Sequence, residues 1–189
     1  MRRARSQGYR SRAAFKLLEI NSRDRLLIPG ALVADLGAAP GGWSQVAAGK
    51  VGSRGRVFAV DLLEIAPISG VTILRGDFRD PSMRAKLAGE IGARKLDVVL
   101  SDLSPNLTGI AAVDQARAAE LARAAAAFCR SHLSAGGAFL CKLFQGGEFG
   151  ALLGEMKEIF SKVEIRKPAA SRGESRETYL LARGLKGIQ

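Results

Sequence analysis

Polar side chains that could do chemistry follow several short apolar runs of this chain. Four of them are acids, Asp35, Asp61, Asp77 and Asp102. The fifth is Lys142, which interrupts an apolar run. A lysine in apolar surroundings is costly unless it is paired or functional, because lysine is rarely fully buried. These residues could therefore bind a polar ligand and activate a proton-bearing group on it.

A glycine-rich segment begins at the first of these acids. It reads Asp35-Leu-Gly37-Ala-Ala-Pro-Gly41-Gly42-Trp43. Its spacing differs from the G-x-G-x-x-G of dinucleotide sites, which hold a pyrophosphate at a helix N-terminus. An acid two residues before the first glycine would repel a phosphate, but it suits a cationic or amino-bearing ligand. S-adenosylmethionine, with a sulfonium, an amino group and no phosphate, is such a ligand.

The next two acids are placed to complete a nucleoside site. Asp61 could accept hydrogen bonds from two vicinal ribose hydroxyls, as acids do at this place in nucleotide-binding sheets. Asp77 could accept a hydrogen bond from an adenine amino group. Each acid alone is better explained as a turn residue that caps the next helix. Three acids at successive strand ends are not well explained in that way.

The elements that must position these residues alternate between short apolar strands and helices. This alternation predicts an α/β, Rossmann-like fold, with a mostly parallel sheet, helices on both faces and a C-terminal antiparallel hairpin. Ser11 is expected to cap the first helix, and Gly136-Gly137 to turn the chain before the fifth strand. We expect strands at 31–36, 57–60, 71–74, 96–100, 138–143, 162–166 and 178–182. We expect helices at 12–21, 43–48, 81–91, 114–133 and 148–160.

Length and composition bound the class of protein. The 189 residues fit one domain, residues 1–189, whose basic segment 1–10 is expected to be mobile. The net charge of +11 favours a polyanionic partner, and nucleic acid rather than membrane, because no basic amphipathic helix stands out. Cys129 and Cys141 show no metal-ligand spacing. They are expected to be reduced core residues of a cytoplasmic protein, and no metal site is predicted.

Several stretches together resemble the FtsJ/RrmJ family of ribose 2′-O-methyltransferases. Nearly the whole chain takes part in the resemblance, and the combination is highly specific. The matching stretches are Tyr9-Arg-Ser-Arg-Ala-Ala-Phe-Lys16-Leu, Asp35-Leu-Gly-Ala-Ala-Pro-Gly-Gly-Trp-Ser-Gln45, Gly76-Asp-Phe-Arg-Asp80, Ser101-Asp102 through Pro105-Asn106, Lys142 through Phe144-Gln-Gly146, Arg166-Lys-Pro168 and Ser175-Arg-Glu177.

The resemblance implies an S-adenosylmethionine-dependent enzyme that methylates RNA. Its implied substrate is a uridine of large-subunit ribosomal RNA, within the assembled subunit or as free RNA, and its implied state is a monomer in the cytoplasm. The family carries a Lys-Asp-Lys-Glu tetrad of catalytic residues, which corresponds here to Lys16, Asp102, Lys142 and Glu177. Glu174 is an alternative to Glu177, which the Ser-Arg-Glu context favours. The family's cofactor-binding positions correspond to Gly41, Trp43, Asp61, Asp77 and Asp102. Asp35 and Gly37 of the glycine-rich segment are also expected to bind the cofactor.

The tetrad also has a chemical reason. A ribose hydroxyl is a poor nucleophile until its proton is lost or loosened. Lys142 could take that proton as a neutral amine or stabilise the alkoxide as a cation, and the sequence leaves both open. Lys16 and Glu177 would orient Lys142, and Asp102 would lie beside the methyl donor.

Other functions remain open at this point. The same chemistry could act on the anticodon loop of transfer RNA. A nicotinamide-dependent oxidoreductase and a non-catalytic RNA-binding protein are alternatives from other classes, although the glycine spacing and the complete tetrad argue against them. RNA phosphates are expected to bind a basic surface near Lys16, formed by Arg2, Arg3, Arg5, Arg10 and Arg12.

Overall fold

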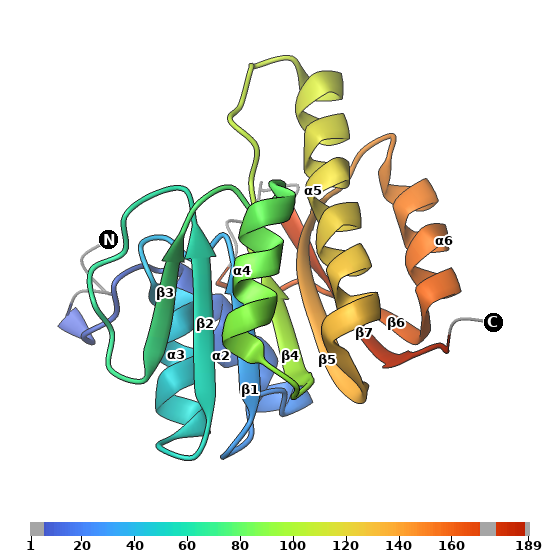
Figure 1. Cartoon of the computed structure of the whole chain (residues 1–189). Coiled ribbons are helices and arrows are strands. Elements are labelled where there is room, and N and C mark those ends of the chain that lie inside the picture. The colour runs from blue at the N-terminus through green and yellow to red at the C-terminus, as the bar shows by residue number, and fades with distance from the viewer. Residues whose placement is uncertain (1–5, 171–176, 188–189) are drawn as a thin grey trace.

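A computed structural model describes residues 6–170 and 177–187 of the chain (Figure 1). Its strands are β1 (Leu32–Leu36), β2 (Arg56–Asp61), β3 (Val71–Arg75), β4 (Leu96–Ser101), β5 (Leu133–Phe144), β6 (Phe160–Arg166) and β7 (Glu177–Leu185). Its principal helices are α2 (Ala13–Asp24), α3 (Gly42–Val51), α4 (Pro81–Ile91), α5 (Ala111–His132) and α6 (Phe149–Ile159).

The strands form one sheet in the order β3-β2-β1-β4-β5-β7-β6. Neighbours among the first five strands pair in parallel, whereas β7 is antiparallel to both β5 and β6. The predicted fold class, including the C-terminal hairpin, is confirmed. Because β1 to β4 are parallel, their carboxyl ends meet at one edge of the sheet, where open α/β folds bind ligands.

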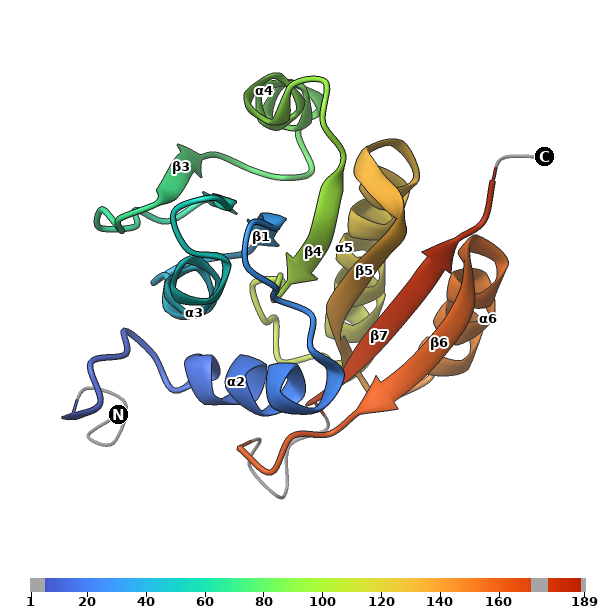
Figure 2. The same ribbon diagram turned by 90° about the horizontal axis from the view of Figure 1, so that it is seen from below.

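Helices cover both faces of the sheet, as Figure 2 shows from below. One face packs against α2 and α3 through Leu17 and Val46. The opposite face packs against α4, α5 and α6 through Leu87, Ala125 and Met156. The central strand β1 is buried along its whole length, as expected for a parallel strand covered on both sides.

Two local predictions are wrong. Ser11 does not cap α2: the helix begins after Arg12 without a side-chain cap, and the Ser11 carbonyl accepts a bond from the Ala14 amide. The fifth strand does not begin at Ala138: β5 begins at Leu133, where it pairs with Leu96 of β4. The predicted turn at Gly136-Gly137 coincides with an irregularity in β5, because the pairing with β4 passes from Leu96–Leu133 directly to Val98–Ala138. Both cysteines are buried and free, as predicted.

Candidate active site

A pocket of about 770 Å³ opens where β1 to β4 end. That volume lies within the range typical of small-molecule and cofactor sites. Its wall combines apolar and charged side chains, with Asp61, Asp77, Asp102 and Lys142 among them. Predicted residues that are far apart in the sequence thus share one cavity.

Asp61 and Asp77 form the rim of the pocket on the β2 and β3 side, and both are partly exposed. The Asp61 carboxylate accepts backbone N–H bonds from Ala39 and Leu63, both at 2.8 Å. Asp77 instead binds the Arg79 guanidinium through both oxygens, which lowers the pKa of Asp77. The backbone bonds leave each Asp61 oxygen with acceptor capacity toward the pocket, because a carboxylate oxygen has two acceptor sites.

Asp35 lies behind the pocket wall and is fully buried. Its Oδ2 atom accepts a hydrogen bond of 2.6 Å from the Ser44 hydroxyl, and its Oδ1 atom has no partner among the described residues. Burial raises the pKa of Asp35 to about 7, although the bond from Ser44 opposes this rise. In this structure Asp35 joins β1 to α3 and is not part of the pocket surface, so its predicted contact with a ligand stays a prediction.

The glycines of this segment permit close packing. Gly37 lines the pocket at a positive φ of 77°, and a Cβ there would approach the Leu103 backbone to 2.8 Å. Gly41 has φ 102°, and a Cβ on it would crowd Ile65 and Arg10 at 3.2 and 3.3 Å. Because an L side chain is strained at such φ values and would also clash, both positions require glycine.

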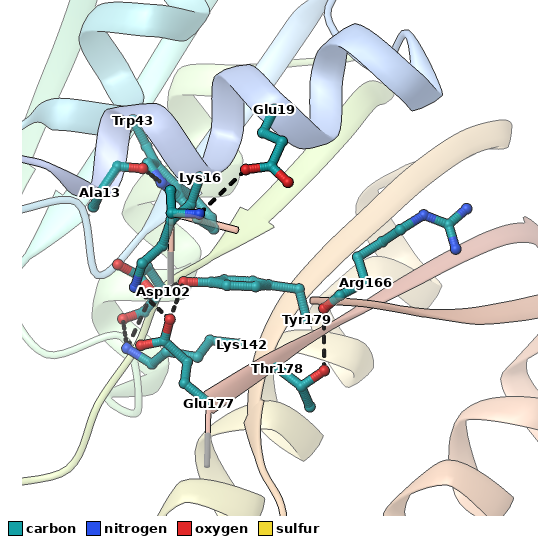
Figure 3. Close-up of polar contacts among 11 residues, drawn as sticks. Ala13, Lys16, Glu19, Trp43, Asp102, Lys142, Arg166, Glu177, Thr178 and Tyr179 are labelled. Atoms are coloured by element: carbon teal, nitrogen blue, oxygen red, sulfur yellow. Dashed lines mark hydrogen bonds and ion pairs between the residues drawn. The ribbon is translucent and has the colours of Figure 1, made fainter. Parts of the chain in front are cut away.

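The four residues of the predicted tetrad converge from four different elements (Figure 3). Lys16 of α2 forms an ion pair with Glu177 at the start of β7. Lys142 of β5 donates to the Asp102 carbonyl at 2.7 Å and pairs with its Oδ1 atom at 3.1 Å. Both lysines are buried. The two lysines and two acids compensate one another's charge, as buried ionic groups require.

Tyr179 connects the two halves of the tetrad, and the sequence did not single it out. Its hydroxyl lies 3.0 Å from Glu177 Oε1 and 3.5 Å from Asp102 Oδ1, and its ring packs against Trp43 (Figure 3). Lys142 is its register partner on β5. The sequence did carry a signal for Tyr179. Residues two apart on a strand point to the same face of the sheet, and Tyr179 is two residues from Glu177.

The surroundings shift the pKa values of the two acids of the tetrad in opposite directions. Burial raises the pKa of Asp102, and the charge and hydrogen bond of Lys142 offset this only in part. Burial also acts to raise the pKa of Glu177, but the hydrogen bond and charge of Lys16 outweigh it and lower that pKa. The pairing with Lys16 therefore favours the charged form of Glu177, whereas burial disfavours the charged form of Asp102.

A second set of contacts fixes α2 against the C-terminal hairpin. Buried Arg166 of β6 binds both carboxylate oxygens of Asp24, at 2.7 and 2.8 Å. Glu19 accepts N–H bonds from Ala169 and Ala170. Trp43 of α3 donates from its indole to the Ala13 carbonyl at 2.8 Å. These contacts hold Lys16 opposite Glu177. Trp43 packs between the helices and is not among the residues that line the pocket.

Known proteins show the same combination of sequence and fold. Residues 9–185 match the family model described as FtsJ-like methyltransferase. The chain belongs to this FtsJ-like methyltransferase family. Membership in a methyltransferase family contradicts the oxidoreductase alternative.

Two relatives illustrate how similar the members are. Ribosomal RNA large subunit methyltransferase E of Nitrosospira multiformis is 53% identical over 184 residues, which cover 97% of this chain and 89% of that protein. The protein of the same name from Chromobacterium violaceum is 50% identical over 181 residues, covering 96% and 88%.

Solved structures share the fold of this FtsJ-like chain. A structure from Plasmodium falciparum described as a ribosomal RNA methyltransferase has a TM-score of 0.86 and 27% identity, covering 95% of this chain and all of that one. Fibrillarin of Aeropyrum pernix, solved with natively bound S-adenosyl-L-methionine, has a TM-score of 0.63 and 18% identity, covering 92% and 75%. The second likeness shows the fold alone.

Some predictions concern residues in other parts of the chain. Arg2, Arg3, Arg5 and the alternative acid Glu174 lie outside the described residues. Arg10 was predicted to bind RNA phosphates. In the structure its guanidinium donates hydrogen bonds to the carbonyls of Pro40, Ala66 and Pro67. No helix in the described ranges is long and apolar enough to cross a membrane.

Proposed function

We propose that this protein transfers a methyl group from S-adenosylmethionine to the 2′-hydroxyl of a ribose in large-subunit ribosomal RNA, at a uridine. The observation that carries the proposal is the tetrad, with its two buried lysines, beside a pocket rimmed by acids. The relatives named as ribosomal RNA large subunit methyltransferases support the substrate class. The net charge of +11 suits an RNA substrate.

The residues present fit S-adenosylmethionine. Asp61 offers carboxylate oxygens to a ribose diol, and Asp102 offers a negative charge to the sulfonium or amino group. Gly37 carries no side chain that would fill this side of the pocket. Asp77 is held by Arg79, so it would accept an adenine amino group through the lone pairs that remain. The pocket volume also suits a ligand of nucleoside size.

Lys142 is the group that would act on the ribose hydroxyl. Bound S-adenosylmethionine supplies a methyl carbon made electrophilic by the sulfonium. Lys142 lines the pocket, and its ammonium is held by the side chain and carbonyl of Asp102. This pairing supports the cationic role, in which Lys142 donates to the hydroxyl oxygen and stabilises its developing negative charge while the hydroxyl proton passes to water. The neutral-base role would require the proton to leave the pair first.

The other tetrad members orient Lys142 and exclude water. Glu177 and Tyr179 lie on the same face of β7, and Tyr179 pairs in register with Lys142. Lys16 neutralises Glu177, so the site holds no excess charge. A preorganised and partly dry site of this kind supplies most of its stabilisation without reorganising during the reaction.

The proposal is tested by methyl transfer to ribosomal RNA. Purified protein and tritiated S-adenosylmethionine are incubated with large subunits, and with free RNA, from cells that lack this enzyme. We expect label at one uridine and a phosphodiester bond after it that resists alkali, because a 2′-O-methyl group blocks cleavage. Label on a base, with an alkali-sensitive bond, would overturn the ribose assignment. Methylation of transfer RNA without methylation of ribosomal RNA would overturn the proposed substrate.

A further inference from the structure

Several exposed apolar side chains line the pocket or lie in the chain segment between two of its wall residues. Leu62 and Leu63 line it directly. Leu107, Ile110 and Val113 are also exposed, and they lie in the chain between two residues of its wall, Asn106 and Arg117. We call residues 104–113 the prong. Clustered exposed apolar surface beside a polar site marks an interaction surface, since it carries a solvation cost.

The prong is held in a defined shape. Asp114 accepts hydrogen bonds from the Thr108 amide and hydroxyl at 2.7 and 2.8 Å, and from the Gly109 amide at 3.2 Å. Ile110 donates its amide to the Thr108 hydroxyl. Figure 1 shows the loop after β4 rising to an end of α5 that stands clear of the sheet. The apolar side chains are thus presented on a built projection.

We propose that the prong binds an unpaired segment of the RNA substrate by packing Leu107 and Ile110 against base faces. This inference rests on the proposed function and names the substrate form that the site accepts. Unpaired RNA exposes its bases for stacking on protein side chains, whereas a duplex hides them. The prong continues directly into the pocket wall, where Arg117 offers positive charge to the adjoining phosphates. A protein partner would not require this continuity with the pocket.

The test compares variants at matched exposed positions. Ile110 is 61% exposed and Leu107 76%, while Ile28 is 56% exposed and precedes β1, at the opposite end of the strands from the pocket. The probe variant is Leu107→Ser with Ile110→Ser, and the control is Ile28→Ser. Exposed substitutions of this kind change stability little, which thermal unfolding verifies. Leu107→Trp is a third variant, because an aromatic ring stacks better on a base.

Binding is measured by the fluorescence anisotropy of a short labelled single-stranded RNA of mixed sequence, and of the same RNA annealed to its complement, over a salt series. We expect the probe variant to bind the single strand about tenfold more weakly. Its duplex binding and its slope of log affinity against log salt should be unchanged, because no phosphate contact is lost. Leu107→Trp should bind the single strand at least as well as wild type, and Ile28→Ser should equal wild type.

Equal single-strand affinity in the probe variant would overturn the inference. So would an equal loss on the duplex, which would indicate backbone contacts. Unchanged binding to RNA with weaker binding to intact large subunits would assign the prong to a protein partner instead. If the wild-type protein transferred no methyl group, the proposed function would fail, but the anisotropy comparison would still decide this inference.

Discussion

The acids at the rim of the pocket and the charged residues of the tetrad have opposite surroundings. Asp61 and Asp77 are partly exposed, and each is held by groups of its own turn, two residues ahead. Lys16 and Glu177 meet across 161 positions of sequence, and Lys142 and Asp102 across 40. Apart from the bond from Ala39 to Asp61, the rim acids are therefore held by local turns, whereas the tetrad exists only when the whole sheet has assembled. Substituting residues in the tetrad should accordingly affect catalysis and stability more than changes at the rim.

The largest expected effect is on the rate. Lys142→Ala should slow methyl transfer by about 10²–10⁴-fold, because it removes the group that would act on the hydroxyl. Binding of the demethylated cofactor, measured by calorimetry, should change little. Lys162→Ala, at an exposed lysine of β6, is the control. Single-turnover transfer of tritiated methyl groups measures the rate, and a wild-type rate in the variant would end the catalytic assignment.

The next effect is on stability. Lys16→Met removes the ion-pair partner of the partly buried Glu177, and breaking such a pair costs about 3 kcal/mol. Adding Glu177→Gln should recover part of this loss, because the unpaired charge is then removed. Urea unfolding of wild type, both single variants and the double variant gives the coupling free energy. Additive losses would show that the two charges do not stabilise each other.

At the rim, the expected effect is on ligand affinity. Asp61→Ala should weaken binding of S-adenosylmethionine and its product by about 1.5–3 kcal/mol, the typical value of a charge-assisted hydrogen bond. Asp80→Ala is a matched control, because Asp80 also accepts a backbone bond two residues ahead but does not line the pocket. Calorimetry distinguishes the two variants. Unchanged affinity in Asp61→Ala would remove this acid from the site.

The smallest effect concerns the buried acid of β1 and depends on pH. An unfolded Asp35 loses its proton near pH 3.9, but the folded one keeps it to about pH 7. Within that window the folded state binds one more proton, so raising the pH favours unfolding. Wild type should lose about 1 kcal/mol more than Asp35→Asn for each pH unit.

Urea unfolding of both proteins at two pH values inside this window measures the difference. Asn cannot ionise, so the variant keeps whatever pH dependence the other groups contribute. Parallel losses in the two proteins would show that Asp35 is ionised in the folded state. Cofactor affinity of Asp35→Asn adds a second readout, because a ligand contact through Asp35 would weaken it.

Much of the fold could be predicted because its signals are local. Short apolar runs between turns indicated the parallel strands, and an acid at the end of each run marked the edge that binds ligands. Pro81 followed by a helical pattern gave α4 with its observed bounds, residues 81–91. The failed predictions, the cap at Ser11 and the start of the fifth strand at Ala138, concern segments whose structure depends on distant neighbours.

The sequence by itself determined the α/β class, the family resemblance and the identity of the residues that could do chemistry. Tertiary structure alone decided that Asp35 is buried behind the pocket while Asp61 lines it, and that Tyr179 joins the two acids of the tetrad. Strand patterns reflect interactions over a few residues, so they predicted the C-terminal hairpin but not which strands far apart in the sequence pair. The pairing of β5 with β7 sets which side chains meet, and that pairing is fixed only by packing of the complete sheet.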